Sequence, residues 1–219
     1  MELYHLCNRG VEKRTVFLDD GDRARFVHGL FVFNDLHATA NYIAHLRGTQ
    51  SHSSKRDLLV HIHAWCLMEN HYHLLVSPVD DDLTKLSLFA QKLGMGYSKF
   101  FNDKYVRSGS LWQGKYRKIL VENNSHFLHV PHYIHLNPLD FSMPEWRTGG
   151  VKDTGKAFQT LKEYKWSSLL DYLGEKNFPS VVDTRLLKDS IGAPNSFKMR
   201  MKEIIGDGSL AANSLSFEM

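Results

Sequence analysis

The hydrophobic and polar positions along the chain follow the short alternation typical of strands in some segments and the spacing typical of helices in others. Together they predict a mixed α+β fold. Residues 58–67 and 71–77 are short apolar runs on either side of the turn candidate Met68-Glu69-Asn70, which predicts an antiparallel hairpin. Residues 83–101 and 125–137 carry apolar positions at helical spacing. Strands that alternate with helices around a central hairpin predict a central antiparallel sheet with helices packed on it.

Shorter patterns complete this outline. The predicted elements are a strand over 3–8, a helix starting at Asp19-Asp20-Gly21-Asp22, a helix over 35–47, a polar loop over 48–57 and a strand within 110–122. The Gly/Lys/Thr-rich stretch 147–156 resembles a linker. We therefore expect one domain over 1–146 and a small helical C-terminal extension over 157–219, which ends in a polar tail.

The composition is that of an ordinary globular chain. It has 219 residues, 42% hydrophobic and 23% charged, with a net charge of +3 and a pI near 8.7. This mild basicity argues only weakly for nucleic acid. Cys7 and Cys66 form no CxxC motif, which predicts a reducing compartment without a disulfide framework. No signal peptide or membrane span is expected, so the predicted location is the cytoplasm, with no membrane partner.

Two histidine pairs are candidates for a metal site. His71 and His73 are two residues apart in a predicted strand, so both imidazoles lie on one face and can reach one ion. His61 and His63 have the same spacing, and spacing alone does not choose between the pairs. An isolated HxH is more often an ordinary strand sequence.

A second candidate group lies at the end of the predicted helix 125–137. Tyr133 and Asn137 are four residues apart, so a helix places them on one face, toward a common neighbour. Asn137 also precedes Pro138, where a helix commonly ends. Tyr133 could equally be an ordinary half-buried aromatic residue, and Pro131 either starts this helix or kinks it.

Basic and aromatic residues interleave in residues 99–118, which hold six Lys or Arg and one acidic residue. Basic groups pair with phosphates, and aromatic faces stack on unpaired bases. The competing interpretation, a solvated loop whose aromatic rings pack into the core, is about as probable from this stretch alone.

Five segments, in this order, resemble the REP-associated tyrosine transposases, relatives of the single-tyrosine insertion-sequence transposases in the HUH nuclease superfamily. They are YHLCNRGVEKRTVFLDD, WCLMENHYHLLVSP, RSGSLWQGKYRK, HYIHLNPL and YKWSSLLDYLG. The resemblance spans roughly residues 3–175. It implies the HUH/RRM-like transposase fold, with residues 1–146 as the catalytic domain.

The resemblance assigns roles to the candidate residues. The family's metal-binding pair maps onto His71 and His73, its nucleophile onto Tyr133 and its third metal ligand onto Asn137. The middle residue of the pair is Tyr72 rather than an aliphatic residue, which departs from the family pattern. Pro131 is a second departure and leaves the start of the helix open.

The implied activity is a metal-dependent single-strand DNA endonuclease and strand transferase. Tyr133 would form a 5′-phosphotyrosine link, with Mg²⁺ or Mn²⁺ as the cofactor. The implied partner is single-stranded DNA beside a REP-like hairpin, which suggests association with the nucleoid. Relatives of the insertion-sequence type are dimers, so a homodimer is implied too, although the chain has no dimer signature. The residues expected to contact DNA are Arg9, Arg107, Trp112, Gln113, Lys115, Arg117 and Lys118, with Trp112 as a base stack.

Two other functions compete with this prediction. The first is a DNA-hairpin-binding regulator that has lost the chemistry. The second is an unrelated metal-dependent hydrolase that uses water, with His61, His63 and Glu69. His135 is a weak candidate for proton transfer, and we expect it to be an exposed helix residue instead.

Overall fold

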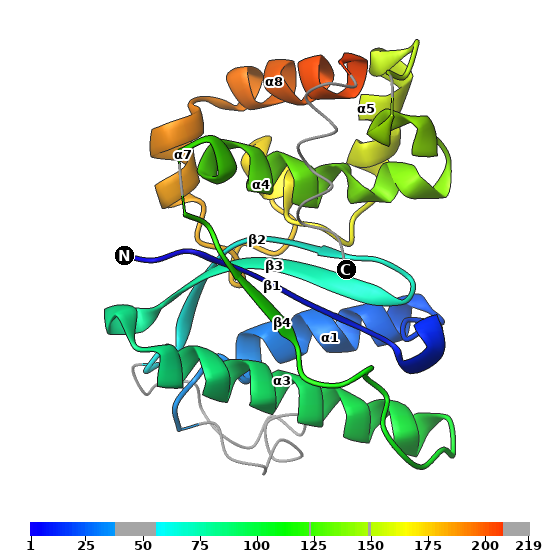
Figure 1. Ribbon diagram of the computed structural model, residues 1–219, viewed down its shortest axis with the longest axis vertical. Helices are drawn as coiled ribbons and strands as arrows, with labels where there is room; N and C mark the ends of the chain where they lie inside the picture. The colour runs from blue at the N-terminus through cyan, green and yellow to red at the C-terminus, as the bar shows by residue number, and fades with distance from the viewer. Residues whose placement is uncertain (38–55, 123, 149, 208–219) are drawn as a thin grey trace.

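The computed structural model describes residues 1–37, 56–122, 124–148 and 150–207 in three layers (Figure 1). A twisted sheet forms the middle layer. Helices α1 and α3 cover one face, and α4 with the C-terminal helices covers the other. Three predicted segments lie wholly or largely outside the described residues. They are the part of the predicted helix 35–47 after residue 37, most of the loop 48–57 and the tail after 207. The predicted α+β class with a central antiparallel sheet is confirmed.

The sheet has the order β2-β3-β1-β4, and its neighbouring strands are antiparallel. Its strands are β1 (Tyr4–Arg9), β2 (Val60–Leu67), β3 (His71–Pro78) and β4 (Arg117–Leu120). The predicted hairpin is present, and the Met68 amide donates to the carbonyl of His71 at 2.8 Å. Cys66 and Cys7 lie opposite His73 on its two neighbouring strands, so His73 occupies the centre of the sheet.

Helices α1 (Asp20–Val32) and α3 (Leu83–Lys104) pack on one face of the sheet. The predicted start of α1 is confirmed, since Asp19 and Asp22 form a capping box there. Asp22 is buried and accepts hydrogen bonds from Lys104 Nζ at 2.7 Å and the Tyr105 hydroxyl at 2.8 Å. This paired charge joins the first turn of α1 to the end of α3. The short helices η1 (Val11–Lys13) and η2 (Val79–Asp81) lie at the strand ends.

Helix α4 (Asn124–Leu136) crosses the other face, over β2 and β3. Pro131 lies inside this helix and neither starts nor ends it. The α-helical turns stop at Leu136, one residue before the Asn-Pro step, and the chain continues as the 3₁₀ helix η3 (Asn137–Phe141). Proline at its second residue fits the first turn of a helix, where a missing amide donor costs little.

The C-terminal helices share the core of the molecule. They are η4 (Pro144–Arg147), α5 (Thr154–Glu163), α6 (Leu169–Tyr172), α7 (Arg185–Ile191) and α8 (Pro194–Gly206). The Ser168 hydroxyl accepts the amide of Trp65 on β2 at 2.9 Å. The predicted linker 147–156 is no free spacer, because Val151 is buried and donates to the Ile205 carbonyl at 3.1 Å. No helix among the described residues is long and apolar enough to cross a membrane.

Candidate active site

Three rings converge between the centre of the sheet and helix α4. His71 and His73 project from β3 toward α4, and their ring centroids are 4.8 Å apart. The ring of Tyr133 on α4 lies edge-on to His73, with centroids 5.6 Å apart. Tyr72 points to the opposite face, where it contacts Phe26 of α1. Because side chains alternate along a strand, the two imidazoles face the phenol of Tyr133, and Tyr72 between them points into the core on the other side of the sheet.

Each imidazole has a hydrogen-bond partner at Nδ1. His73 Nδ1 lies 2.9 Å from Nε2 of His5 on β1, and His71 Nδ1 lies 2.6 Å from the side-chain oxygen of Asn70. His73 Nε2 is buried without a hydrogen-bond partner. With the protons on Nδ1, both rings have an Nε2 lone pair to offer, as metal-binding histidines do. Sequence reasoning missed His5, because only the pairing of β1 with β3 brings it to His73.

These imidazoles are neutral at physiological pH. Burial, followed by the positive charge of Arg9 on the neighbouring strand, lowers the pKa of His71 to about 3. Burial, followed by the charges of His71 and His5, lowers the pKa of His73 well below its usual value. A neutral imidazole can donate a lone pair to a cation without first losing a proton.

Asn137 lies one helical turn after Tyr133, at the end of α4. Its amide nitrogen donates to the Tyr133 carbonyl at 2.8 Å, which satisfies a carbonyl at the end of α4. Its amide oxygen accepts a hydrogen bond from Arg147 Nη2 at 3.1 Å, and the Arg147 guanidinium lies 5.6 Å from the centre of the Tyr133 ring. Asn137 therefore has a structural role in ending the helix, and Arg147 holds its amide oxygen, the atom that would bind a cation.

The side chains of the candidate site are enclosed by the protein. Tyr133 is 1% exposed, His73 2% and Asn137 0%. A phosphate can reach the phenol only if the atoms around it move. The donor set fits a small divalent ion in part, with two imidazole nitrogens and one amide oxygen, and phosphate or water oxygens would complete it.

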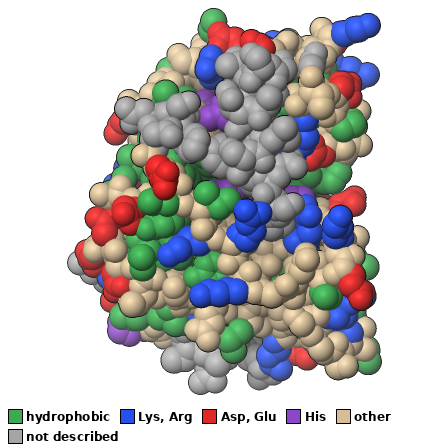
Figure 2. Space-filling view, in the orientation of Figure 1, with side chains coloured by type: hydrophobic (Ala, Val, Ile, Leu, Met, Phe, Trp, Pro, Cys, Tyr) green, Lys and Arg blue, Asp and Glu red, His purple; other side chains and the backbone are tan. Residues whose placement is uncertain are grey.

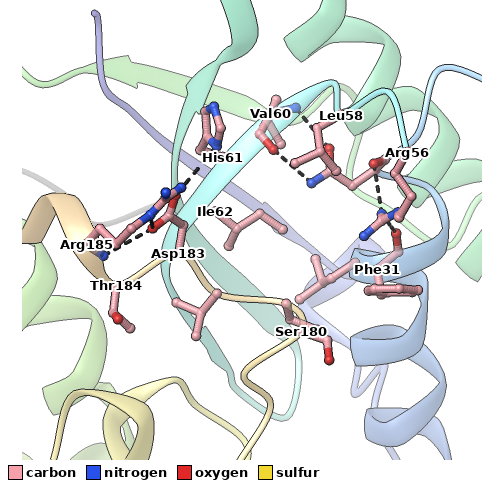
Figure 3. Close-up of a pocket in the computed structure, with 14 residues that line it drawn as sticks. Phe31, Arg56, Leu58, Val60, His61, Ile62, Ser180, Asp183, Thr184 and Arg185 are labelled. Atoms are coloured by element: carbon pink, nitrogen blue, oxygen red, sulfur yellow. Dashed lines mark hydrogen bonds and ion pairs between the residues drawn. The ribbon is translucent and has the colours of Figure 1, made fainter.

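The rival pair lies elsewhere on β2. His61 Nδ1 is 3.7 Å from Asp183, which also binds Arg185, beside a cavity of about 390 Å³ (Figure 3). His63 Nε2 lies 2.9 Å from the hydroxyl of Ser77. Across the described ranges, no group of three or more His, Cys, Asp or Glu is placed to hold a metal ion. Glu69, at the β2–β3 turn, therefore forms no such group with this pair among the described residues.

Four of the residues expected to bind DNA form an exposed polar and basic strip. Gln113, Lys115, Arg117 and Lys118 are exposed in the loop before β4 and on the strand itself. Figure 2 shows Lys and Arg side chains across the middle of the face on which β4 lies. No described acidic residue forms an ion pair with Lys115 or Lys118. Both can therefore interact with phosphates without first breaking an internal pair.

The other three expected DNA contacts lie in different surroundings. The Trp112 ring is 7% exposed and packs against Tyr72 and Tyr97, so its main role is in the core rather than as an open base stack. Arg107 is held by Asn102 at 2.6 Å within the loop after α3. Arg9 lies opposite His71 on β1, so its charge is directed to the enclosed site.

His135 differs from the prediction of an exposed helix residue. Its side chain is fully buried, and Nε2 lies 2.7 Å from the hydroxyl of Ser168. His132, one turn earlier, is buried against the ring of Phe197, with centroids 4.6 Å apart. Both histidines are buried because the C-terminal helices cover the face of α4 that would otherwise meet solvent. The sequence pattern did not predict this packing.

These two histidines predict a loss of stability in acid. Burial lowers the pKa of His132 to about 4 and that of His135 to about 3, so below pH 6.5 the unfolded chain binds protons that the folded chain does not. Stability from this source is complete above pH 6.5 and falls as the pH drops. These two histidines should contribute about 4 kcal/mol to the decrease in the free energy of unfolding between pH 7 and pH 5, roughly 2 kcal/mol each.

Urea denaturation at both pH values measures this loss. His135→Gln keeps a hydrogen-bonding group beside Ser168 and should make the decrease smaller by about 2 kcal/mol. His37→Gln changes a histidine with a 76% exposed side chain and should leave the decrease intact. Equal free energies of unfolding at pH 5 and pH 7 would contradict the prediction.

Comparison with known proteins identifies one matching family. Residues 41–137 match the family model described as "Transposase IS200 like". A solved structure of a REP-associated tyrosine transposase bound to a REP hairpin aligns with 83% of this chain and 88% of its own, at 14% identity and a TM-score of 0.46. No curated protein sequence matches the chain. The family match confirms the resemblance seen in the sequence segments, and its range contains His71, His73, Tyr133 and Asn137.

Proposed function

From the premise that residues 41–137 match the IS200-like transposases, we propose that this protein is a metal-dependent single-strand DNA endonuclease and strand transferase. The observation that carries the proposal is the position of Tyr133, whose ring centroid lies 5.6 Å from that of His73. The two residues are 60 positions apart in the sequence, and they meet because α4 packs on β3.

We propose that His71 and His73 bind the divalent cation, Mg²⁺ or Mn²⁺, through Nε2, and that Asn137 binds it through its amide oxygen. The ion would polarise the scissile phosphate and offset its developing negative charge. Neighbouring residues fix the orientation and the protonation state of the proposed ligands. His5 and Asn70 orient the imidazoles, and burial keeps both rings unprotonated.

Tyr133 is the proposed nucleophile. Its phenol oxygen forms a bond to phosphorus while the bond from phosphorus to the DNA 3′-oxygen breaks. The phenol loses its proton and the departing 3′-oxygen gains one, which leaves a 5′-phosphotyrosine link and a free 3′-hydroxyl. The number of phosphate ester bonds is unchanged, so another 3′-hydroxyl can displace the tyrosine and join two strands without ATP.

The proposed substrate is single-stranded DNA next to a REP-like hairpin. The strip made by Gln113, Lys115, Arg117 and Lys118 offers a positively charged surface for its phosphates. The test of the whole proposal is to incubate the protein with Mn²⁺ or Mg²⁺ and a hairpin-flanked oligonucleotide, and to look for an adduct that survives denaturation. A metal titration that never yields an adduct would refute the proposal.

Removing charge from the strip should weaken DNA binding in a salt-dependent way. For Lys115→Gln combined with Lys118→Gln, the slope of log affinity against log salt should fall by about 1.4, because each lost phosphate contact on a single strand removes roughly 0.7. Filter binding or anisotropy between 50 and 300 mM NaCl would measure the slope, about five salt points being enough for a line.

A matched control changes the same charge elsewhere. Lys188 and Lys198 are exposed on α7 and α8, in the layer beyond α4. Their double replacement by glutamine should leave the salt slope unchanged. If both double variants lower the slope equally, DNA binding does not use the strip.

One observation favours the alternative, a DNA-hairpin-binding regulator without chemistry. Tyr133 is almost completely buried, which is unusual for a group that must meet a phosphate. The regulator predicts hairpin binding that is unaffected by EDTA, together with no covalent adduct in any metal. The enzyme predicts an adduct that requires both the metal and the phenol.

A further inference from the structure

Arg147 is the last residue of η4, and hydrogen bonds fix the orientation of its side chain beside the end of α4. Its Nε donates to Asp140 Oδ1 at 2.7 Å, and its Nη2 donates to Asp140 Oδ2 at 2.6 Å. The same carboxylate accepts Trp146 Nε1 at 2.8 Å. Two parallel bonds between planar groups set direction as well as distance. The side chain of Arg147 is only 16% exposed, so its positive charge has a defined place in the protein.

This charge faces two of the proposed site residues. Arg147 Nη2 donates to the side-chain oxygen of Asn137 at 3.1 Å, and its guanidinium carbon lies 5.6 Å from the Tyr133 ring centre. The amide of Asn137 has a fixed orientation too, because its nitrogen donates to the Tyr133 carbonyl. The oxygen that would bind a cation is therefore the oxygen that Arg147 holds.

A guanidinium and a divalent cation beside the same amide oxygen repel one another. We propose that Arg147 competes with the divalent cation for the side-chain oxygen of Asn137 and so sets the metal affinity of the site. The inference rests on the proposed function, since it takes Asn137 as a ligand. After release, Arg147 keeps its bonds to Asp140 and stays beside Tyr133, where its charge stabilises the attacked phosphate.

The test is Mn²⁺ binding by the full chain without DNA, followed by the electron paramagnetic resonance signal of free Mn²⁺. Arg147→Gln removes the charge, and the dissociation constant for Mn²⁺ should fall by about five- to tenfold. Arg147→Met keeps an unbranched stem against Trp146 and should tighten binding in the same direction. Arg200→Gln removes an exposed charge on α8 and should leave the constant unchanged. Thermal unfolding shows which variants are folded.

A double-mutant cycle separates competition from simple repulsion. In an Asn137→Ala background, Arg147→Gln should tighten Mn²⁺ binding by about twofold or less, because the contested oxygen is gone. An equal gain in both backgrounds would overturn the proposal, as would a folded Arg147→Gln or Arg147→Met protein with the wild-type constant. If neither the wild type nor the Arg147 variants bind Mn²⁺, the metal requirement of the proposed function fails as well.

Discussion

Replacing Tyr133 with phenylalanine should abolish the covalent protein–DNA adduct, with a loss of at least about 10³-fold in the rate of strand cleavage. Phenylalanine keeps the ring that packs beside His73 but has no oxygen to attack phosphorus. Hairpin binding should change by less than about twofold, because the lost hydroxyl is buried and uncharged, whereas the strip binds phosphates through its charges. Denaturing gel electrophoresis of labelled oligonucleotide with Mn²⁺ measures the adduct.

Tyr116→Phe is the matched control for this variant. It also removes one phenol oxygen, from a partly exposed residue whose hydroxyl lies 3.3 Å from Ser87. Its adduct yield should equal that of the wild type. An adduct that persists in Tyr133→Phe would show that another residue is the nucleophile, and the proposed mechanism would be wrong.

Replacing His73 with alanine should reduce Mn²⁺-dependent cleavage by about 10²- to 10³-fold, the range for losing one fixed electrostatic partner of a transition state. His73 lies at the centre of the sheet, and its buried Nε2 has no hydrogen-bond partner. Mn²⁺ binding should weaken in parallel, which separates loss of the ion from loss of the nucleophile.

The rival pair provides the control for this prediction. His61→Ala removes one imidazole of the second HxH pair, on β2, where its partner is Asp183. Cleavage by this variant should continue at the wild-type rate. The opposite pattern, with loss in His61→Ala and retention in His73→Ala, would move the metal site to β2. Single-turnover cleavage at saturating Mn²⁺ distinguishes the two patterns.

Local patterns in the sequence were sufficient for most of the secondary structure. The turn Met68-Glu69-Asn70 and the apolar runs beside it determine the β2–β3 hairpin and its register, which places Cys66 opposite His73. The acidic start of α1 and the helix that ends before Pro138 are local too, because capping and proline act within one turn. Tyr133 and Asn137 lie one turn apart, which lets the Asn137 amide reach the Tyr133 carbonyl.

Contacts between distant segments could not be predicted in this way. The 147–156 stretch has the composition of a linker, yet Arg147 reaches back to Asn137 and Tyr133 because Asp140 and Trp146 hold it there. Trp112 looked like a base stack in a basic stretch, but the core under α3 takes up its ring. His135 looked exposed until the C-terminal layer covered it.

The sequence by itself determined the main strands and helices and the central hairpin, because these depend on short-range periodicity and on local turn and capping residues. Only the tertiary structure decided which faces meet. It placed His5 beside His73, the Tyr133 ring beside His73 and the half-buried guanidinium of Arg147 beside Asn137, since strand order and helix packing are set by the burial of surfaces far apart in the chain.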